Sequence, residues 1–407
     1  MDEKSYLRSL AEKYMMYAKS KEMEEKANMW YEHNDFVSNK VPVIMEIDTF
    51  LNDIMPPLQC ESKYAREIEK YLQYYIVNYE LIGDDKVIPK EYKVPLQIHF
   101  KMFDIDMKEE HSSEDGSVAH KMEATITDLE TEVYELKKST WYFDEEETRK
   151  HYNLAAEILG DLMPVVYENQ SLRWELTPTQ HAVNLLTMQE LFMAMYDCPD
   201  ELHLLMKKIV TDLKEYCYWQ EESGLLTSNL GNQYAGAGSY GFTRQIVPIG
   251  DKVLLSEMWG NTNSQESVGI SPQMYEEFFA PYYRELTEIF GMVYYGCCEP
   301  ANEMWDSILT YKNLKKVSVS AWADEAFMGK ALAENRIIYS RKPSPNFIGV
   351  EQNFDEAAFE AYIRKTFECA KDCQLEIIFR DIYTLCGDIT KPKRAIQIVR
   401  KLIKEYR

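Results

Sequence analysis

Apolar residues recur along the chain with two different spacings. Residues 61–82 (ESKYAREIEKYLQYYIVNYELI) place Ile68, Leu72 and Ile76 at intervals of four, which predicts a helix. A long helical zone is predicted from about 179 to 218, and the tetrapeptide Asp-Cys-Pro-Asp at 197–200 predicts a turn and a new helix start within it. The other spacing belongs to short apolar runs that end in polar residues.

These short runs predict β-strands. They are VPVIMEID (41–48), MPVVYE (163–168), VLLSEMW (253–259), VYYGCC (293–298), VSVSAW (317–322), RIIYSRK (336–342) and EIIFRD (376–381). From residue 253 onward each run is followed by a helical stretch, which is the alternation typical of a parallel sheet. No G-x-G-x-x-G follows any of them, so the pattern favours a (β/α)₈ TIM barrel over a dinucleotide-binding sheet.

The domain organisation follows from the same pattern. We expect one barrel domain over residues 1–407, because no low-complexity linker divides the chain. Residues 1–40 are charged with recurring Leu, Met and Tyr, and we expect a helical N-terminal extension there. The loop signals in HSSEDG predict that residues from about 105 to 140 form an excursion off the barrel.

Composition and charge exclude some classes of function. The net charge of -23 opposes binding to nucleic acid or to an anionic membrane, because both would be repelled. No apolar run approaches the roughly 18 residues that span a bilayer, and the charged first 20 residues do not resemble a signal peptide. The eight cysteines are not spaced as a disulfide framework. We therefore expect a cytoplasmic protein with free thiols.

Catalytic residues of a (β/α)₈ barrel follow its strands, so the residues after each run are candidates. After the run at 253–259, Glu257, Trp259 and Gln265 offer an aromatic ring and hydrogen-bonding groups that could bind a flat substrate. A tryptophan packed into a loop beside solvated polar neighbours explains them equally well.

The next run ends in Tyr295, Cys297, Cys298 and Glu299. Thiolate and carboxylate are both zinc ligands, which makes the two cysteines and the glutamate metal candidates and places Tyr295 at the substrate. The alternative is that two small cysteines are simply buried in the core.

Two later runs supply charged candidates. Asp324, with Trp322 beside it, is a candidate catalytic carboxylate, although it could equally cap the helix that follows. Arg341 and Lys342 alternate in direction along their strand, so one of them is expected to face the barrel mouth and hold a carboxylate or phosphate.

The last run adds Asp381 as a candidate catalytic residue and Cys386 as a candidate metal ligand. All strand ends converge at the mouth of a barrel, so Cys386 could approach Cys297 there. No histidine occurs after His203, which argues against a Ser-His-Asp hydrolase with its site in this half. H-E-x-x-H, P-loop and C-x-x-C motifs are absent as well.

The order of these motifs resembles the uroporphyrinogen decarboxylase superfamily. The motifs are GCCEP, VSVSxWAD, SRKPxP and ExIxxDxxT, and the resemblance is clear from 257 to 387. It points to the divergent bacterial members. The superfamily is built on (β/α)₈ barrels and includes zinc-dependent methyltransferases that move a methyl group from a corrinoid protein to a thiol.

The resemblance also implies a set of metal ligands. Those methyltransferases carry His-x-Cys after one strand and a cysteine after the last strand; here Tyr295-x-Cys297 and Cys386 occupy these positions. Tyrosine is a poor zinc ligand, so Cys298 or Glu299 would have to complete the site. The arginine-rich N-terminal signature of true uroporphyrinogen decarboxylases is not visible, which argues against heme biosynthesis.

Three hypotheses follow. The first is methyl transfer from a methylcorrinoid, carried by a small corrinoid-binding partner protein, to a thiol activated by zinc. The second is a metal-free decarboxylase or lyase of a carboxylated small molecule, in which Asp324 or Asp381 stabilises a developing cation and Lys342 holds the carboxylate. The third is a non-catalytic chaperone or corrinoid-binding module, because fold alone does not fix function.

Overall fold

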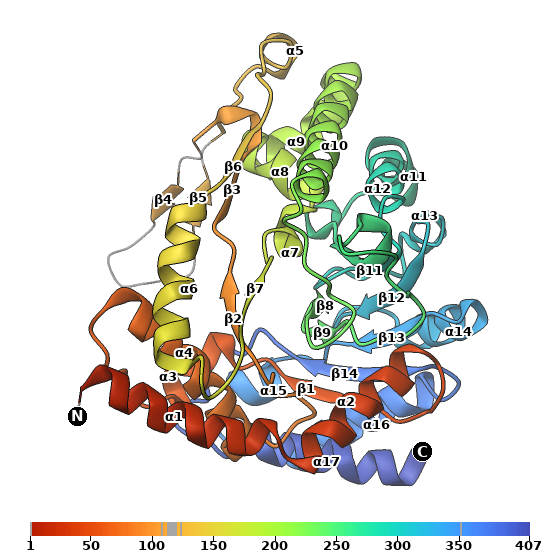
Figure 1. Cartoon of the computed structure of the whole chain (residues 1–407). Coiled ribbons are helices and arrows are strands. Elements are labelled where there is room, and N and C mark those ends of the chain that lie inside the picture. Colours follow the sequence, from red (N-terminus) through yellow and green to blue (C-terminus); the bar gives the residue numbers. More distant parts are fainter. Residues whose placement is uncertain (1, 107–108, 112–119, 123, 351) are drawn as a thin grey trace.

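The computed structural model describes every residue except 1, 107–108, 112–119, 123 and 351 (Figure 1). It is an α/β fold whose main sheet has six parallel strands in the order β1-β14-β13-β12-β11-β10. These strands are β1 (Val43–Met45), β10 (Trp259–Thr262), β11 (Met292–Tyr295), β12 (Leu314–Val319), β13 (Ile338–Arg341) and β14 (Leu375–Phe379).

A second, two-stranded parallel sheet pairs β2 (Tyr92–Pro95) with β7 (Val165–Glu168). In the described part of the chain, no ladder joins β1 to β2 or β7 to β10. The predicted alternation and the parallel direction are therefore confirmed, whereas the strands of the described residues do not close into a hydrogen-bonded ring.

Six of the predicted runs overlap an observed strand by at least three residues, although β11, β12 and β14 begin one to three residues before their runs. The seventh run is shifted further. The run at 253–259 was expected to be a strand, but Leu255–Glu257 forms a 3-10 turn and the strand begins only at Trp259. The Glu257 carboxylate accepts the backbone N–H groups of Ile249 and Leu254, and these bonds hold the turn. A side chain that satisfies backbone donors in this way competes with strand pairing.

The helices surround the sheets (Figure 1). They are α1 (Glu3–Ala18), α2 (Lys21–Asn34), α3 (Leu51–Ile54), α4 (Lys63–Val77), α5 (Leu129–Glu132), α6 (Glu145–Leu159), α7 (Leu172–Glu175), α8 (Pro178–Leu186), α9 (Met188–Asp197), α10 (Pro199–Glu222), α11 (Pro272–Phe278), α12 (Ala280–Thr287), α13 (Trp305–Ile308), α14 (Glu325–Asn335), α15 (Asn346–Gly349), α16 (Glu356–Cys369) and α17 (Lys391–Tyr406). None of the described helices has the length and apolar character that crossing a bilayer requires.

The long helical zone has two breaks instead of one. The predicted break is confirmed, because α9 ends at Asp197 and α10 begins at Pro199. A further break lies at Thr187, whose φ of 77° is incompatible with a helix and separates α8 from α9. Thr187 also caps α9 by accepting the backbone N–H of Glu190, a role that threonine commonly takes.

Residues between β2 and α6 form antiparallel pairs apart from the main sheet. β3 (Ile98–Lys101) pairs with β6 (Thr140–Phe143), and β4 (Glu109–His111) pairs with β5 (His120–Met122). The predicted excursion at 105–140 falls in this region, and its loop HSSEDG lies largely outside the described residues.

The two faces of the main sheet differ in polarity. Successive side chains of a strand point to opposite faces, so one set meets the surrounding helices and the other points inward. The helix-facing set is largely apolar and includes Val293, Val317, Val319, Tyr339, Ile377 and Phe379. The inward set includes four buried polar residues, Lys316, Ser318, Ser340 and Glu376.

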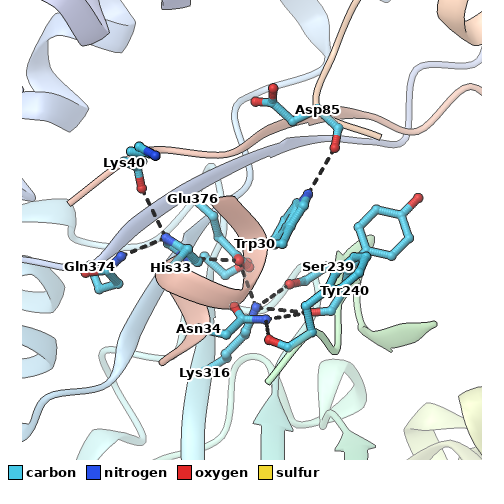
Figure 2. A network of polar contacts seen from close by, with 12 residues as sticks. Trp30, His33, Asn34, Lys40, Asp85, Ser239, Tyr240, Lys316, Gln374 and Glu376 are labelled. Atoms are coloured by element: carbon cyan, nitrogen blue, oxygen red, sulfur yellow. Dashed lines mark hydrogen bonds and ion pairs between the residues drawn. The ribbon is translucent and has the colours of Figure 1, made fainter. Parts of the chain in front are cut away.

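The polar inner face is covered by the N-terminal extension and by a hairpin. α2 brings Trp30, His33 and Asn34 against it, and the hairpin of β8 (Tyr234–Gly236) and β9 (Ser239–Tyr240) covers it beside them (Figure 2). The Asn34 side chain donates to the backbone carbonyls of Tyr240 and Phe242, which joins the helix to the hairpin.

A buried ion pair lies at the centre of this contact (Figure 2). Lys316 Nζ is 2.9 Å from Glu376 Oε2, and both side chains are fully buried. His33 Nε2 lies 3.3 Å from the same oxygen, and Lys316 also donates to Ser239 Oγ at 2.7 Å. Burial alone would raise the pKa of Glu376, but the Lys316 charge and the nearby His33 ring outweigh it and hold that pKa well below its ordinary value.

Removing this carboxylate is expected to destabilise the fold. Glu376→Gln keeps the shape but leaves the Lys316 charge buried without its counter-ion, which typically costs about 3–5 kcal/mol. Urea unfolding followed by circular dichroism measures the loss. The matched control is Glu334→Gln, whose exposed pair with Lys330 spans 3.9 Å and is expected to contribute less than about 1 kcal/mol. Equal losses in the two variants would contradict the assignment.

Candidate functional site

A cavity of about 650 Å³ lies where the main sheet faces the β2–β7 sheet. Its wall includes Glu46 directly after β1, Lys93 on β2, Glu168 at the end of β7, and Arg380 and Asp381 directly after β14. Residues at the carboxyl ends of parallel strands are the usual positions for catalytic groups in α/β folds. We therefore take this cavity as the candidate active site.

The cavity wall combines charged groups of both signs with aromatic rings. Its cations are Lys70, Lys86, Lys93, Arg173 and Arg380, its carboxylates are Glu46, Asp48, Glu67, Glu168 and Asp381, and its aromatic side chains are Tyr71, Tyr74, Tyr75, Trp174, Tyr234 and Tyr240. Glu168 is 3.0 Å from both Lys93 Nζ and Arg173 Nη2, so these two cations already have a counter-ion.

Glu46 is the carboxyl group with the clearest sign of acid-base function. Its backbone N–H donates to the Phe379 carbonyl at 2.8 Å, which fixes the residue at the end of β1. Burial raises its pKa and outweighs the nearby Arg380 charge. A carboxyl with a raised pKa in a cavity is suited to accept and return a proton near neutral pH.

The hairpin of β8 and β9 forms one wall and comes very close to the strands. Gly238 has a φ of 82°, and a Cβ there would lie 2.6 Å from Ile378 Cγ2 and 2.9 Å from Glu46 Cδ. Only glycine combines this backbone conformation with such a close approach.

Three of the predicted residues converge beside the cavity. Cys297 and Cys298 Sγ atoms are 3.6 Å apart, and Cys298 Sγ is 3.3 Å from Asp381 Oδ2. The hydrogen bond with Cys297 and burial both raise the pKa of Cys298, so its thiol keeps the proton and can donate it. Asp381 lines the cavity, so the cysteine pair contacts the site through this carboxylate.

Lys342 lies behind the wall and is connected to the buried ion pair. Its Nζ donates to Ser340 Oγ at 2.7 Å, and the Ser340 hydroxyl donates to Glu376 Oε1 at 2.6 Å. Burial lowers the pKa of Lys342 to about 7, although the charges of Glu376 and Glu46 oppose the shift. Lys342 can therefore gain or lose a proton at neutral pH.

The four predicted zinc ligands do not form one set. Glu299 accepts the backbone N–H groups of Ser264 and Cys297, and the Cys386 thiol contacts the carbonyls of Gly349 and Val350. Among the described residues no three His, Cys, Asp or Glu side chains are grouped to hold a metal ion. The arrangement does not fit zinc bound by Cys297, Cys298, Glu299 and Cys386.

The predicted substrate-binding residues Glu257, Trp259, Gln265 and Tyr295 have structural roles. Glu257 holds the turn before β10, and the Gln265 amide donates to Asn263 Oδ1. Trp259 is buried and donates from its indole N–H to the Gly241 carbonyl. The Tyr295 hydroxyl is 3.1 Å from that of Tyr275 on the helix-facing side, so it points away from the cavity.

Asp324, predicted as a catalytic residue, also has a structural role. Asp324 accepts the backbone N–H groups of Ala326 and Phe327 and is the N-cap of α14, as the alternative interpretation held. Trp322 is 74% exposed.

Arg341 is fully buried and pairs with Glu325 at 3.0 Å, so it is not available as a substrate anchor. Lys342 lies on the other face of the strand, where its Nζ donates to Ser340 Oγ.

Sequence reasoning missed Glu46, Lys93, Glu168, Arg173 and Tyr234. The signal was present for the two glutamates, because VPVIMEID and MPVVYE are strands and each places a glutamate at the strand end. Tyr234 comes from a short hairpin with no strand pattern of its own.

Comparison with known proteins supports the fold. No protein family matches the sequence, and no curated protein matches it. The structure is similar to that of a methyltransferase from Methanosarcina mazei, with a TM-score of 0.52 and 9% sequence identity, over 93% of this chain and 98% of that chain. At this identity the similarity concerns the fold. Membership of the uroporphyrinogen decarboxylase superfamily stays a prediction.

The lowered pKa of Lys342 predicts a specific dependence of stability on pH. Its pKa is about 7 in the folded state and about 10.5 when exposed, so the unfolded chain binds more protons between these values and stability rises with pH. The contribution is at most roughly 1.4 kcal/mol per pH unit. We expect Lys342→Met to remove this slope. Urea unfolding of the unmodified protein and of Lys342→Met at pH 7.5 and 9.5 measures this. If the free energy of unfolding rose equally with pH in the two proteins, the prediction would be contradicted.

The donor arrangement also predicts the metal content. We expect the protein purified without chelators to hold less than about a tenth of an equivalent of zinc, with no change in Cys386→Ser, because a tight site needs three or four converging ligands. Elemental analysis measures both. One equivalent that is lost in Cys386→Ser and retained in the control Cys369→Ser would restore the predicted zinc site.

Proposed function

We propose that this chain is a methyltransferase that moves a methyl group from a methylcorrinoid, carried by a small partner protein, to a thiol bound in the cavity. The observation that carries the proposal is the position of Glu46, Arg380 and Asp381 around one cavity at the carboxyl ends of β1 and β14. The similarity of fold to a methyltransferase supports it.

We also propose that β2 and β7 occupy the places of the second and third strands in an open (β/α)₈ arrangement. Chain order supports this, because both strands come after β1 and before β10. Residues of β1, β2 and β7 line the same cavity, as strand ends around one barrel mouth would.

In this proposal Glu46 is the general base. Its carboxylate takes the proton of the acceptor thiol, the thiolate sulfur forms a bond to the methyl carbon, and the bond between that carbon and its donor breaks with the electron pair left on the donor. When bound, the corrinoid supplies an activated methyl group. Asp381 keeps the Cys298 thiol oriented at the cavity edge through their 3.3 Å contact.

The loops after β12, β13 and β14 form the proposed contact face for the partner protein. They expose Trp322, Val350 and Tyr383, which are 74%, 63% and 58% exposed. Aromatic side chains are enriched in the centres of protein interfaces.

The proposal is tested by methyl transfer from methylcobalamin to small thiols such as 2-mercaptoethanol and 3-mercaptopropionate, followed by loss of methylcobalamin absorbance. We expect Glu46→Gln to lower kcat by about 10²- to 10⁴-fold, as for other general bases. Since burial raises the Glu46 pKa, activity of the unmodified protein should fall with decreasing pH at a pKa above the ordinary value for glutamate. Glu46→Gln should remove this limb of the profile.

Glu80→Gln is the control, because Glu80 pairs with Lys13 and Tyr17 outside the cavity. We expect it to keep the activity and the pH profile. An unchanged rate in Glu46→Gln would exclude Glu46 as the base, and no transfer to any thiol would exclude the function.

A second candidate is a metal-free decarboxylase or lyase. Two neighbouring cations favour this candidate: Arg380 lines the cavity, and Lys342 lies behind its wall. Two cations can bind a carboxylate and stabilise the negative charge that develops during the reaction. Release of carbon dioxide from a carboxylated small molecule, unaffected by a chelator and lost in Asp381→Asn, would identify this class instead.

A further inference from the structure

Arg380 presents unused hydrogen-bond donors at the cavity. The guanidinium carries five N–H donors in a planar fork. Its side chain is only 12% exposed, yet Nε and Nη1 make no hydrogen bond within the described part of the chain. Buried polar groups of this kind are normally paired, because leaving them unpaired costs free energy. This arginine is therefore incompletely satisfied by its own protein.

The nearest carboxylates do not remove this deficit. Glu46 Oε2 and Asp381 Oδ2 are each 3.3 Å from Arg380 Nε, but neither contact has hydrogen-bond geometry. Asp381 Oδ2 already accepts the thiol of Cys298. Burial raises the pKa of Glu46, which makes it a weaker counter-ion. Nε and Nη1 of Arg380 therefore still have hydrogen bonds to donate to an anion.

A second unpaired donor lies nearby. The Tyr234 hydroxyl is buried without a hydrogen-bond partner in the described residues, and its pKa, raised chiefly by burial, also responds to the Glu46 and Arg380 charges. The Trp174 ring lies 5.5 Å from the Tyr234 ring and 5.9 Å from Arg380 Cζ. All three side chains line the cavity.

We propose that the cavity binds a small molecule through its carboxylate, which accepts two hydrogen bonds from Arg380 and one from the Tyr234 hydroxyl. The fork of an arginine matches the two oxygens of a carboxylate, and such charge-assisted pairs are strong. Trp174 provides a flat apolar surface for the rest of the molecule. This inference rests on the proposed function in one respect: it makes the methyl acceptor a thiol that carries a carboxylate.

Arg173 shows why the assignment is specific to Arg380. It lies in the same cavity, but its Nη2 is 3.0 Å from Glu168 and its guanidinium stacks over the Tyr234 ring at 5.5 Å. Its charge already has a counter-ion, so a bound carboxylate gains less from it. The two arginines thus differ in hydrogen bonding: Arg173 donates to Glu168, whereas Nε and Nη1 of Arg380 lie near carboxylates but make no hydrogen bond in the described residues.

Binding of benzoate and benzamide to the full-length protein tests the inference without any methyl donor. The two probes have the same shape, and only benzoate carries the charge. Isothermal titration calorimetry is expected to give an affinity at least about tenfold higher for benzoate, as for hydrogen bonds between charged groups. Equal affinities, or no binding of either probe, would overturn the inference.

Variants locate the site. Arg380→Gln is expected to abolish the preference for benzoate, Arg380→Lys to keep about a tenth of the benzoate affinity, and Tyr234→Phe to weaken binding about three- to tenfold. Arg173→Gln removes the same charge from the same cavity and should keep the preference. Loss of the preference in Arg173→Gln to the same extent as in Arg380→Gln would replace specific binding by a general charge effect. Circular dichroism establishes that each variant is folded.

Turnover separates this inference from the proposed function. With methylcobalamin as donor, kcat/KM for 3-mercaptopropionate should exceed that for 2-mercaptoethanol at least about tenfold, and Arg380→Gln should equalise them. Equal values in the unmodified protein contradict the carboxylate site only. Benzoate binding that depends on Arg380, without transfer to either thiol, contradicts the methyltransferase function only.

Discussion

A glutamate buried inside a parallel sheet is the constraint on which this structure depends. Glu376 would be unstable there without a cation and several donors, because desolvation of a carboxylate is expensive. Lys316, His33 and Ser340 provide them, and they come from β12, α2 and β13. The N-terminal extension is therefore part of the sheet's interior and not an appendage.

The same carboxylate connects the core to the candidate site. Through Ser340 it reaches Lys342, whose charge interacts with Glu46 and Arg380 at the cavity wall. Two environments result within one sheet. In the interior Glu376 is paired with Lys316, and around the carboxyl ends Arg380 and Tyr234 carry polar atoms without a hydrogen bond in the described residues. Binding sites commonly have this second character, because a ligand supplies what the protein leaves out.

The sequence contained most of the fold and a smaller part of the site. Strands and helices were predictable because each has a local period. The rule that strand ends converge predicted an approach of Cys386 to Cys297, but the structure brings Cys298 to Asp381 instead, and Cys386 contacts Gly349 and Val350. The open ladder between β1 and β2 depends on long-range pairing that no local pattern encodes. Asp324 was ambiguous for a different reason: a carboxylate at a helix start serves equally as a cap or as a catalytic group. Arg341 was misassigned because its partner Glu325 lies on a different element.

The missing ladder between the two sheets bears on how the cavity responds to what it binds. Backbone hydrogen bonds set strand spacing within narrow limits, at about 4.8 Å. Where no such bonds join β1 to β2, side chains alone determine the separation. Changing the rotamers of those side chains costs much less free energy than breaking the backbone hydrogen bonds between two strands. The separation between the two sheets can accordingly adjust to ligands of different size, while every strand keeps its hydrogen-bond register.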